Sequence, residues 1–129
     1  MLPNAANVII ETSKVRDYLL SPIHPVGRFK CAVFTALGYT QEDWEVLARD
    51  LRQLALSDEV TLGQSSPYGQ KYEVNGKLTG PNGRVGHFVT VWLVKPADLL
   101  PLLVTALTRG RRWKTAICRS TFRRWRSRH

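Results

Sequence analysis

The chain has 129 residues and a formal net charge of +9, and 43% of its residues are hydrophobic. This length supports one domain with its own core, and the composition excludes a disordered chain. Residues 1–107 hold ten basic and ten acidic side chains, whereas residues 108–129 hold nine basic and no acidic ones. The charge therefore excludes a uniformly basic nucleic-acid-binding protein, and we expect one domain over 1–107 followed by a basic tail over 108–129.

Three short helices are expected in the first half of the chain. The first covers residues 14–20, and the second runs from Pro25, which suits a first helical position, to a left-handed stop at Gly38. The third covers 41–56, where Thr40 begins a capping box. Their apolar stripes are Val15, Tyr18 and Leu19 in the first helix, and Trp44, Leu47, Ala48, Leu51, Leu54 and Ala55 in the third.

Residues from about 60 onward change to the alternating period of strands. The expected strands cover 60–62, 71–79, 85–94 and 102–107, with a polar loop over 63–69 and turns over 80–83 and 95–98. Residues 85–94 are apolar on both sides, which predicts a central strand with both faces covered. The order predicts an α+β fold, in which two to three N-terminal helices pack on an antiparallel sheet of about four strands and a basic C-terminal extension follows.

The sequence shows no sign of export, membrane insertion or cofactor binding. Its N-terminus lacks the basic and long apolar regions of a secretory signal, and the longest apolar stretch, 99–107, is too short to cross a bilayer. Cys31 and Cys118 have no zinc-type spacing, and no glycine-rich phosphate-binding motif is present. We expect a cytoplasmic protein with reduced thiols and with no metal or cofactor. The sequence leaves its oligomeric state open.

The segment HPVGRFK at 24–30 carries the clearest candidate chemistry. If Pro25 begins the helix, His24 lies at its N-cap, where the helix dipole disfavours a charged imidazole and favours a bound anion. A neutral histidine beside an anion suits a general base for phosphodiester cleavage, and Arg28 and Lys30 suit phosphate binding. The alternative is that His24 only caps the helix and Arg28 pairs with a carboxylate.

A second candidate segment is YGQKY at 68–72. Tyr68 and Lys71 can present a hydroxyl and a cation to a substrate, although Lys71 also fits the solvated face of a strand. Neither a carboxylate pair nor a metal cluster nor a Ser-His-Asp set is recognisable. The enzymatic class with candidate residues is metal-independent acid–base chemistry, of which RNA cleavage by the neighbouring 2′-hydroxyl is the simplest case.

The tail after residue 108 has the pattern of a basic amphipathic helix, which suits contact with nucleic acid. A solvated extension without a binding role is the alternative. The candidate nucleic-acid-binding residues are Arg109, Arg111, Arg112, Lys114, Arg119, Arg123, Arg124 and Arg126.

Six blocks of the chain resemble a bacterial family of domains of unknown function. They are LPNA at 2–5, YLLSPIHPVGRFKCAVFTALGYT at 18–40, YGQKYEV at 68–74, LTGPNGR at 78–84, TVWLV at 90–94 and LVTA at 103–106. Members of the family stand alone or form the C-termini of polymorphic toxins and adhesin-like proteins. The order of elements also resembles the barnase, EndoU, colicin and RelE group of ribonucleases, which is an analogy at the level of fold. The chain departs from the family pattern after Ala106.

The resemblance implies a toxin that cleaves RNA without a metal ion and has a small antitoxin or immunity protein as its partner. The site residues that it implies are His24, Arg28, Lys30, Tyr68, Lys71 and Thr105. Threonine is also common in strands, so Thr105 fits a purely structural role as well. Two other functions stay open: a non-catalytic module that binds protein through its body and nucleic acid through its tail, and a structural partner domain.

Overall fold

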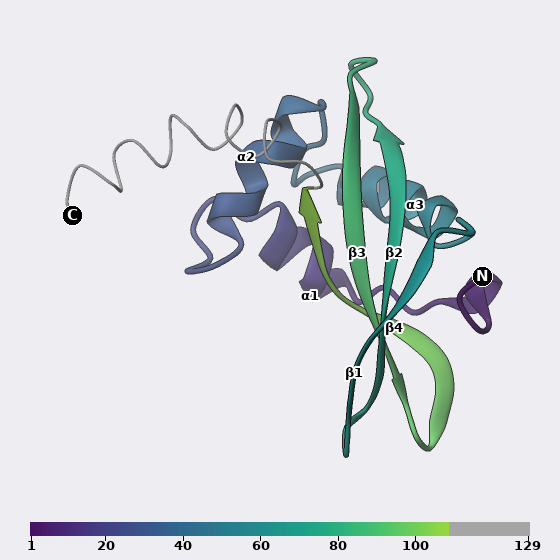
Figure 1. Cartoon of the computed structure of the whole chain (residues 1–129). Coiled ribbons are helices and arrows are strands. Elements are labelled where there is room, and N and C mark those ends of the chain that lie inside the picture. Colours follow the sequence, from purple (N-terminus) through teal and green to yellow (C-terminus); the bar gives the residue numbers. More distant parts are fainter. Residues whose placement is uncertain (109–129) are drawn as a thin grey trace, which may run out of the picture.

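A four-stranded antiparallel sheet forms the centre of the protein, and the helices lie together on one side of it (Figure 1). The structure is a computed structural model that describes residues 1–108. The strands are β1 (Val60–Ser66), β2 (Gly69–Thr79), β3 (Val85–Lys95) and β4 (Asp98–Thr108), and they neighbour one another in chain order. This meander after the helices is the α+β fold expected from the sequence.

The helical part precedes the sheet and consists of short pieces. They are η1 (Ala5–Asn7), α1 (Thr12–Lys14), η2 (Val15–Leu19), α2 (Arg28–Ala36) and α3 (Trp44–Leu54). The helix α1 passes directly into η2, a π-helical turn in which the Leu20 N–H bonds to the Val15 carbonyl at 2.9 Å. The first predicted helix therefore exists, over residues 12–19. Its wide turn is a feature that often marks functional sites.

The core lies between the helices and one face of the sheet. Alternate strand residues point into it, among them Val74 of β2 and Phe88 and Trp92 of β3, all of which are fully buried. Phe34 of α2 stacks on Phe88 with 5.1 Å between ring centroids. The strand period of two thus explains why β2 and β3 carry apolar residues at every second position.

The opposite face of the sheet is not covered by any described helix. On β3 the alternate residues Val85 and His87 are exposed, and Val89 and Val91 are half-buried. The expectation that both faces of this strand are covered was wrong. β-branched residues suit an open antiparallel sheet as well as a buried one, so their presence on both sides of the strand misled the prediction.

The hairpin of β1 and β2 extends four residues beyond the predicted strand. Residues 63–66 are strand and not loop, because they pair with β2 across a bulge between Leu62 and Ser65. The Gln70 amide donates hydrogen bonds to the Gly63 carbonyl and to its neighbouring Lys71 carbonyl, both at 2.9 Å. Cross-strand pairing therefore overrides the weak strand propensity of this polar stretch.

The predicted starts of the second and third helices were too early by three residues. α2 begins at Arg28 and not at Pro25, and α3 begins at Trp44 after a turn in which Thr40 Oγ1 accepts the Asp43 N–H at 3.2 Å. The predicted stop after α2 is confirmed, since Gly38 has a φ of +96°. The capping residues recognised in the sequence therefore lie in turns that precede these two helices, and not at the helix starts themselves.

The turn between β2 and β3 is packed against the end of α2. Asn82 Nδ2 donates a hydrogen bond to the Ala36 carbonyl at 3.0 Å and so satisfies a carbonyl at the helix end. A Cβ at Gly80 would lie 1.9 Å from the Leu37 carbonyl oxygen, so only glycine fits there. The motif LTGPNGR therefore has a structural role in joining α2 to the sheet.

The N-terminal segment lies along the edge of β4. Ile9 pairs with Leu102 in a parallel bridge, with the Ile9 N–H bonded to the Pro101 carbonyl at 2.8 Å. The N-terminal segment thus adds one isolated bridge to the edge of the sheet. No helix within residues 1–108 is long and apolar enough to span a membrane.

We expect the protein to lose stability at alkaline pH because of Tyr39. Its ring is buried, and its hydroxyl donates a hydrogen bond to Asp50 Oδ2 at 2.6 Å. Burial, followed by this hydrogen bond, raises the pKa of Tyr39 above its ordinary value. Above about pH 10 the unfolded chain loses the proton while the folded chain keeps it, so the free energy of unfolding should fall by up to about 1.4 kcal/mol per pH unit.

Urea unfolding of the wild type and Tyr39→Phe from about pH 8 to pH 11 tests this effect. The phenylalanine keeps the ring and removes the proton. The stability advantage of the wild type should shrink as the pH rises past about 10. An advantage that stays constant over the range would contradict the assignment.

Candidate functional site

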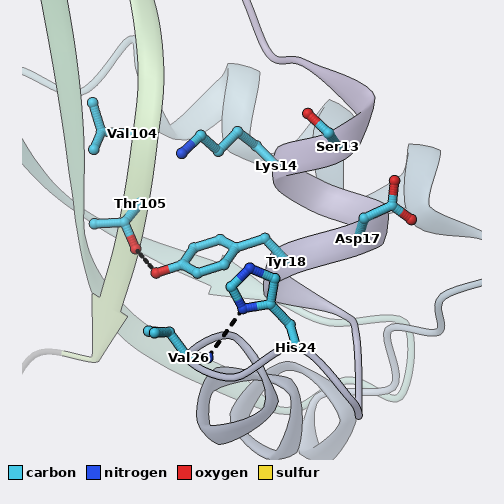
Figure 2. A pocket seen from close by; sticks show the side chains of 8 residues that line it. All are labelled: Ser13, Lys14, Asp17, Tyr18, His24, Val26, Val104 and Thr105. Atoms are coloured by element: carbon cyan, nitrogen blue, oxygen red, sulfur yellow. Dashed lines mark hydrogen bonds between the residues drawn. The ribbon is translucent and has the colours of Figure 1, made fainter.

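A pocket of about 560 Å³ lies between the first helical segment and the edge strand β4. Its size is in the range of ligand-binding pockets. Figure 2 shows that its side chains come from three places: α1 and η2, the loop before α2, and β4. The lining residues are Ser13, Lys14, Asp17, Tyr18, His24, Val26, Val104 and Thr105.

The loop before α2 holds the His24 side chain in one orientation. The backbone N–H groups of Val26 and Gly27 both donate to His24 Nδ1, each at 3.0 Å. Upstream, Ser21 Oγ is buried and accepts the His24 backbone N–H at 3.1 Å. Downstream, the His24 carbonyl accepts the Arg28 N–H at 3.1 Å. The imidazole thus caps the turn that leads into α2, whereas the N-cap position of the helix is Gly27 and not His24 as expected.

Gly27 allows this loop to lie directly against η2. A Cβ at Gly27 would be 1.8 Å from the Tyr18 carbonyl oxygen, so any larger residue would force the two segments apart. The φ of Gly27 is −62°, an ordinary helical value, so the need for glycine comes from the close approach alone. This contact brings the rings of Tyr18 and His24 together, edge to face, with 4.9 Å between centroids.

Tyr18 connects η2 to the sheet through Thr105. Their hydroxyl oxygens are 3.1 Å apart, and both side chains are half-buried (Figure 2). The pair lies beside a bulge in β4, where the pairing with β3 shifts between Val91 and Trp92. Bulges re-aim side chains at the edges of sheets. Two hydroxyl groups and the His24 ring therefore line the same pocket.

The charges of the pocket come from the helical segment. Lys14 Nζ lies 5.4 Å from the centroid of the Tyr18 ring, in cation–π range. Asp17 accepts two hydrogen bonds from Arg16, at 2.9 and 3.0 Å. The Arg16 hydrogen bond lowers the pKa of the Asp17 carboxyl, which is exposed. With Asp17 engaged by Arg16, Lys14 provides a positive charge beside the Tyr18 ring.

Two of the six residues implied by the resemblance, His24 and Thr105, line this pocket. Arg28 is exposed at the start of α2, and Lys30 is half-buried in the same helix; neither is among the lining residues. Tyr68 lies in the turn between β1 and β2, and its side chain is 78% exposed. The fourth residue outside the pocket is Lys71, which pairs with Leu93 in the register of β2 and β3 and is separated from β4 by β3.

The block YGQKYEV that contains Tyr68 and Lys71 has evident structural roles. Gly69 has a φ of +139°, and a Cβ there would lie 2.3 Å from the Val94 carbonyl oxygen. Gln70 satisfies carbonyl groups of the β1 bulge, as described above. Tyr68 and Lys71 therefore remain predictions for a site.

The eight basic residues predicted to bind nucleic acid in the tail, Arg109 to Arg126, lie outside the described residues.

Lys14 and Tyr18 were missed as site residues by sequence reasoning. Tyr18 was assigned to the packing face of the first helix, and Lys14 received no role. Their spacing of four residues places both on one side of a helix, and a cation four residues before an aromatic ring is a usable signal. The contact of Tyr18 with Thr105, 87 residues away in the chain, has no counterpart in the local sequence.

Within residues 1–108, no group of three or more His, Cys, Asp and Glu side chains is arranged to hold a metal ion. The cysteine in this region, Cys31, donates its thiol to the Leu20 carbonyl at 3.3 Å. It therefore helps to fix the loop that follows η2.

A family model matches residues 1–110. The chain belongs to this family, a domain of unknown function (DUF6883). The match covers the sheet, the helices and the whole pocket. No curated protein matches the sequence.

The fold of this DUF6883 protein is similar to that of one chain in a structure described as a contact-dependent growth inhibition toxin–immunity protein complex from Klebsiella pneumoniae 342. The two share 16% sequence identity and a TM-score of 0.63, and the alignment covers 83% of this chain and 97% of that one. At this identity the likeness establishes a shared fold.

The hydrogen bond between Tyr18 and Thr105 should contribute measurably to stability. We expect a double-mutant cycle of Tyr18→Phe and Thr105→Val to give a coupling energy of about 0.5–1.5 kcal/mol, since each variant keeps its shape and removes one hydroxyl. Urea unfolding of the four proteins measures it.

Tyr68→Phe combined with Thr105→Val is the matched control, because Tyr68 is exposed in a distant turn. The effects of these two substitutions on the free energy of unfolding should be additive. A Tyr18–Thr105 coupling as small as the control would show that the two hydroxyls do not interact in solution.

Proposed function

We propose that this protein is a toxin of bacterial cells that cleaves RNA without a metal ion. The observation that carries the proposal is the convergence of an imidazole, a phenol, an ammonium group and an aliphatic hydroxyl on one pocket. They belong to His24, Tyr18, Lys14 and Thr105. The shared fold with a chain from a toxin–immunity protein complex supports the toxin part of the proposal.

The proposed reaction is attack of a ribose 2′-hydroxyl on the adjacent phosphorus. The O2′–P bond forms and the P–O5′ bond breaks, so the products are a 2′,3′-cyclic phosphate and a 5′-hydroxyl. The 2′-hydroxyl loses its proton to a base, and the leaving 5′-oxygen gains one from an acid, so water is neither consumed nor formed. Such chemistry needs proton exchange and stabilisation of negative charge on the phosphoryl oxygens, and it needs no metal.

The pocket groups suit these tasks by their chemistry. Lys14 supplies a positive charge for the phosphate, and its partial burial limits screening by water. Tyr18 and Thr105 supply hydroxyl groups that both donate and accept hydrogen bonds. The position of His24 between η2 and α2 makes its ring accessible from the same cavity.

The proposal includes an immunity or antitoxin protein as partner. A cell that makes a ribonuclease active on its own RNA needs an inhibitor, and the structure with the similar fold is described as a complex that contains an immunity protein.

Expression of this protein alone should therefore arrest bacterial growth, and His24→Ala should relieve the arrest.

We expect the purified protein to cleave labelled total RNA in the presence of EDTA and to leave 2′,3′-cyclic phosphate ends. His24→Ala should slow cleavage by about 10²–10⁴-fold, the usual effect of losing a group that acts on the transition state. The rate of product formation on a denaturing gel measures this effect.

His87→Ala is the control, because His87 is exposed on β3 and does not line the pocket. It should cleave RNA at the wild-type rate. Undiminished cleavage by His24→Ala would remove His24 from the mechanism. Salt-dependent RNA binding without cleavage would instead favour a binding module.

A further inference from the structure

We infer that His24 acts as a neutral hydrogen-bond donor: its Nε2–H group stabilises charge on a bound phosphate, and the ring does not exchange a proton with the substrate. This inference rests on the proposed function for its substrate. The tautomer that it requires is a property of the free protein and can be tested without RNA.

The two hydrogen bonds at Nδ1 determine where the ring proton lies. Both partners, the N–H groups of Val26 and Gly27, are backbone donors and have nothing to accept. Nδ1 must therefore present its lone pair, and in the neutral ring the hydrogen lies on Nε2. An imidazolium would carry a hydrogen on Nδ1 as well, which is incompatible with the two hydrogen bonds that this loop makes there.

The Nε2–H group is directed to the pocket side of the ring. Figure 2 shows the second ring nitrogen on the edge of the ring away from the Val26 N–H and next to Tyr18, which lines the pocket. A neutral imidazole that gives up its Nε2 proton would become an anion, which is a poor product at neutral pH. A neutral ring fixed in this way is suited to hydrogen bonding toward developing negative charge.

The surrounding contacts hold the ring in the orientation that favours this tautomer. Its Nδ1 lies in a turn closed by Ser21 Oγ on one side and by the first N–H of α2 on the other. Gly27 is held against the Tyr18 carbonyl oxygen and cannot retreat with its N–H group. Val26 and Gly27 are therefore positioning residues. Their N–H groups occupy the Nδ1 lone pair, so Nδ1 cannot accept a proton from a substrate while these hydrogen bonds are made. This role differs from the general base expected from the sequence.

Long-range ¹H–¹⁵N correlation spectra of histidine-labelled protein test the tautomer directly. We expect His24 in the free protein at neutral pH to show a protonated Nε2 and a bare Nδ1. The signal is assigned by its loss in His24→Asn. His87, whose side chain is exposed, gives the comparison signal. A proton on Nδ1 of His24, in either the other tautomer or the imidazolium, would overturn the inference.

Two substitutions separate the donor role from the loop role in RNA cleavage. His24→Gln retains an N–H group near the place of Nε2, whereas His24→Asn retains an acceptor near the place of Nδ1 but has no donor at Nε2. We expect His24→Asn to lose about 10²–10³-fold in cleavage rate, as for loss of one donor to a transition state, and His24→Gln to lose about tenfold less. Circular dichroism confirms that both variants are folded.

The outcomes distinguish this inference from the function on which it rests. Equal loss in both variants would show that the imidazole itself exchanges the proton, and would overturn the donor role. If the wild type cleaves no RNA, the proposed function fails, and the spectra alone decide whether the loop holds the neutral donor.

Discussion

The candidate site depends on the close approach of the loop before α2 to the π-helical turn η2. Gly27 lies so near the Tyr18 carbonyl oxygen that no side chain fits between them. This contact brings the His24 ring against the Tyr18 ring, and Tyr18 in turn reaches Thr105 on the edge strand. A shift of the loop by the width of one methyl group would separate these groups. Loss of such geometry is costly in catalysis, where small displacements of reacting groups lower rates strongly.

The scaffold around this contact is rigid where the site needs it. Val15 and Leu19, on the two sides of Tyr18 in the chain, are fully buried, so η2 is anchored in the core while Tyr18 faces the pocket. The edge of β4 is held by its bridge to Ile9 and by its pairing with β3. Function placed on loops that a packed core positions is a common arrangement, and here a helical turn and a strand edge share the task.

Much of the fold could be predicted from local sequence, because hydrophobic period and turn residues act locally. The stripe of Leu47 and Leu51 predicted α3, and the alternation around Val74 predicted β2. The errors came from tertiary pairing: β1 runs on to Ser66 because β2 pairs with it, and β3 has one open face although its residues are apolar on both sides. His24 could be singled out as a candidate because its capping interactions are with its neighbours in the chain. Tyr18 was missed because the contact that gives it a role comes from Thr105, far along the chain.

The central claim is that RNA binds in the pocket between η2 and β4. Amide chemical shifts during titration with a mixed-sequence oligonucleotide that carries 2′-methoxy groups test it most directly, because such a strand cannot be cleaved. We expect shifts centred on the pocket residues, Lys14, Tyr18, His24 and Thr105 among them, that weaken as salt is raised. Shifts confined to Tyr68, Lys71 and the open face of β2, with the pocket unchanged, would contradict it.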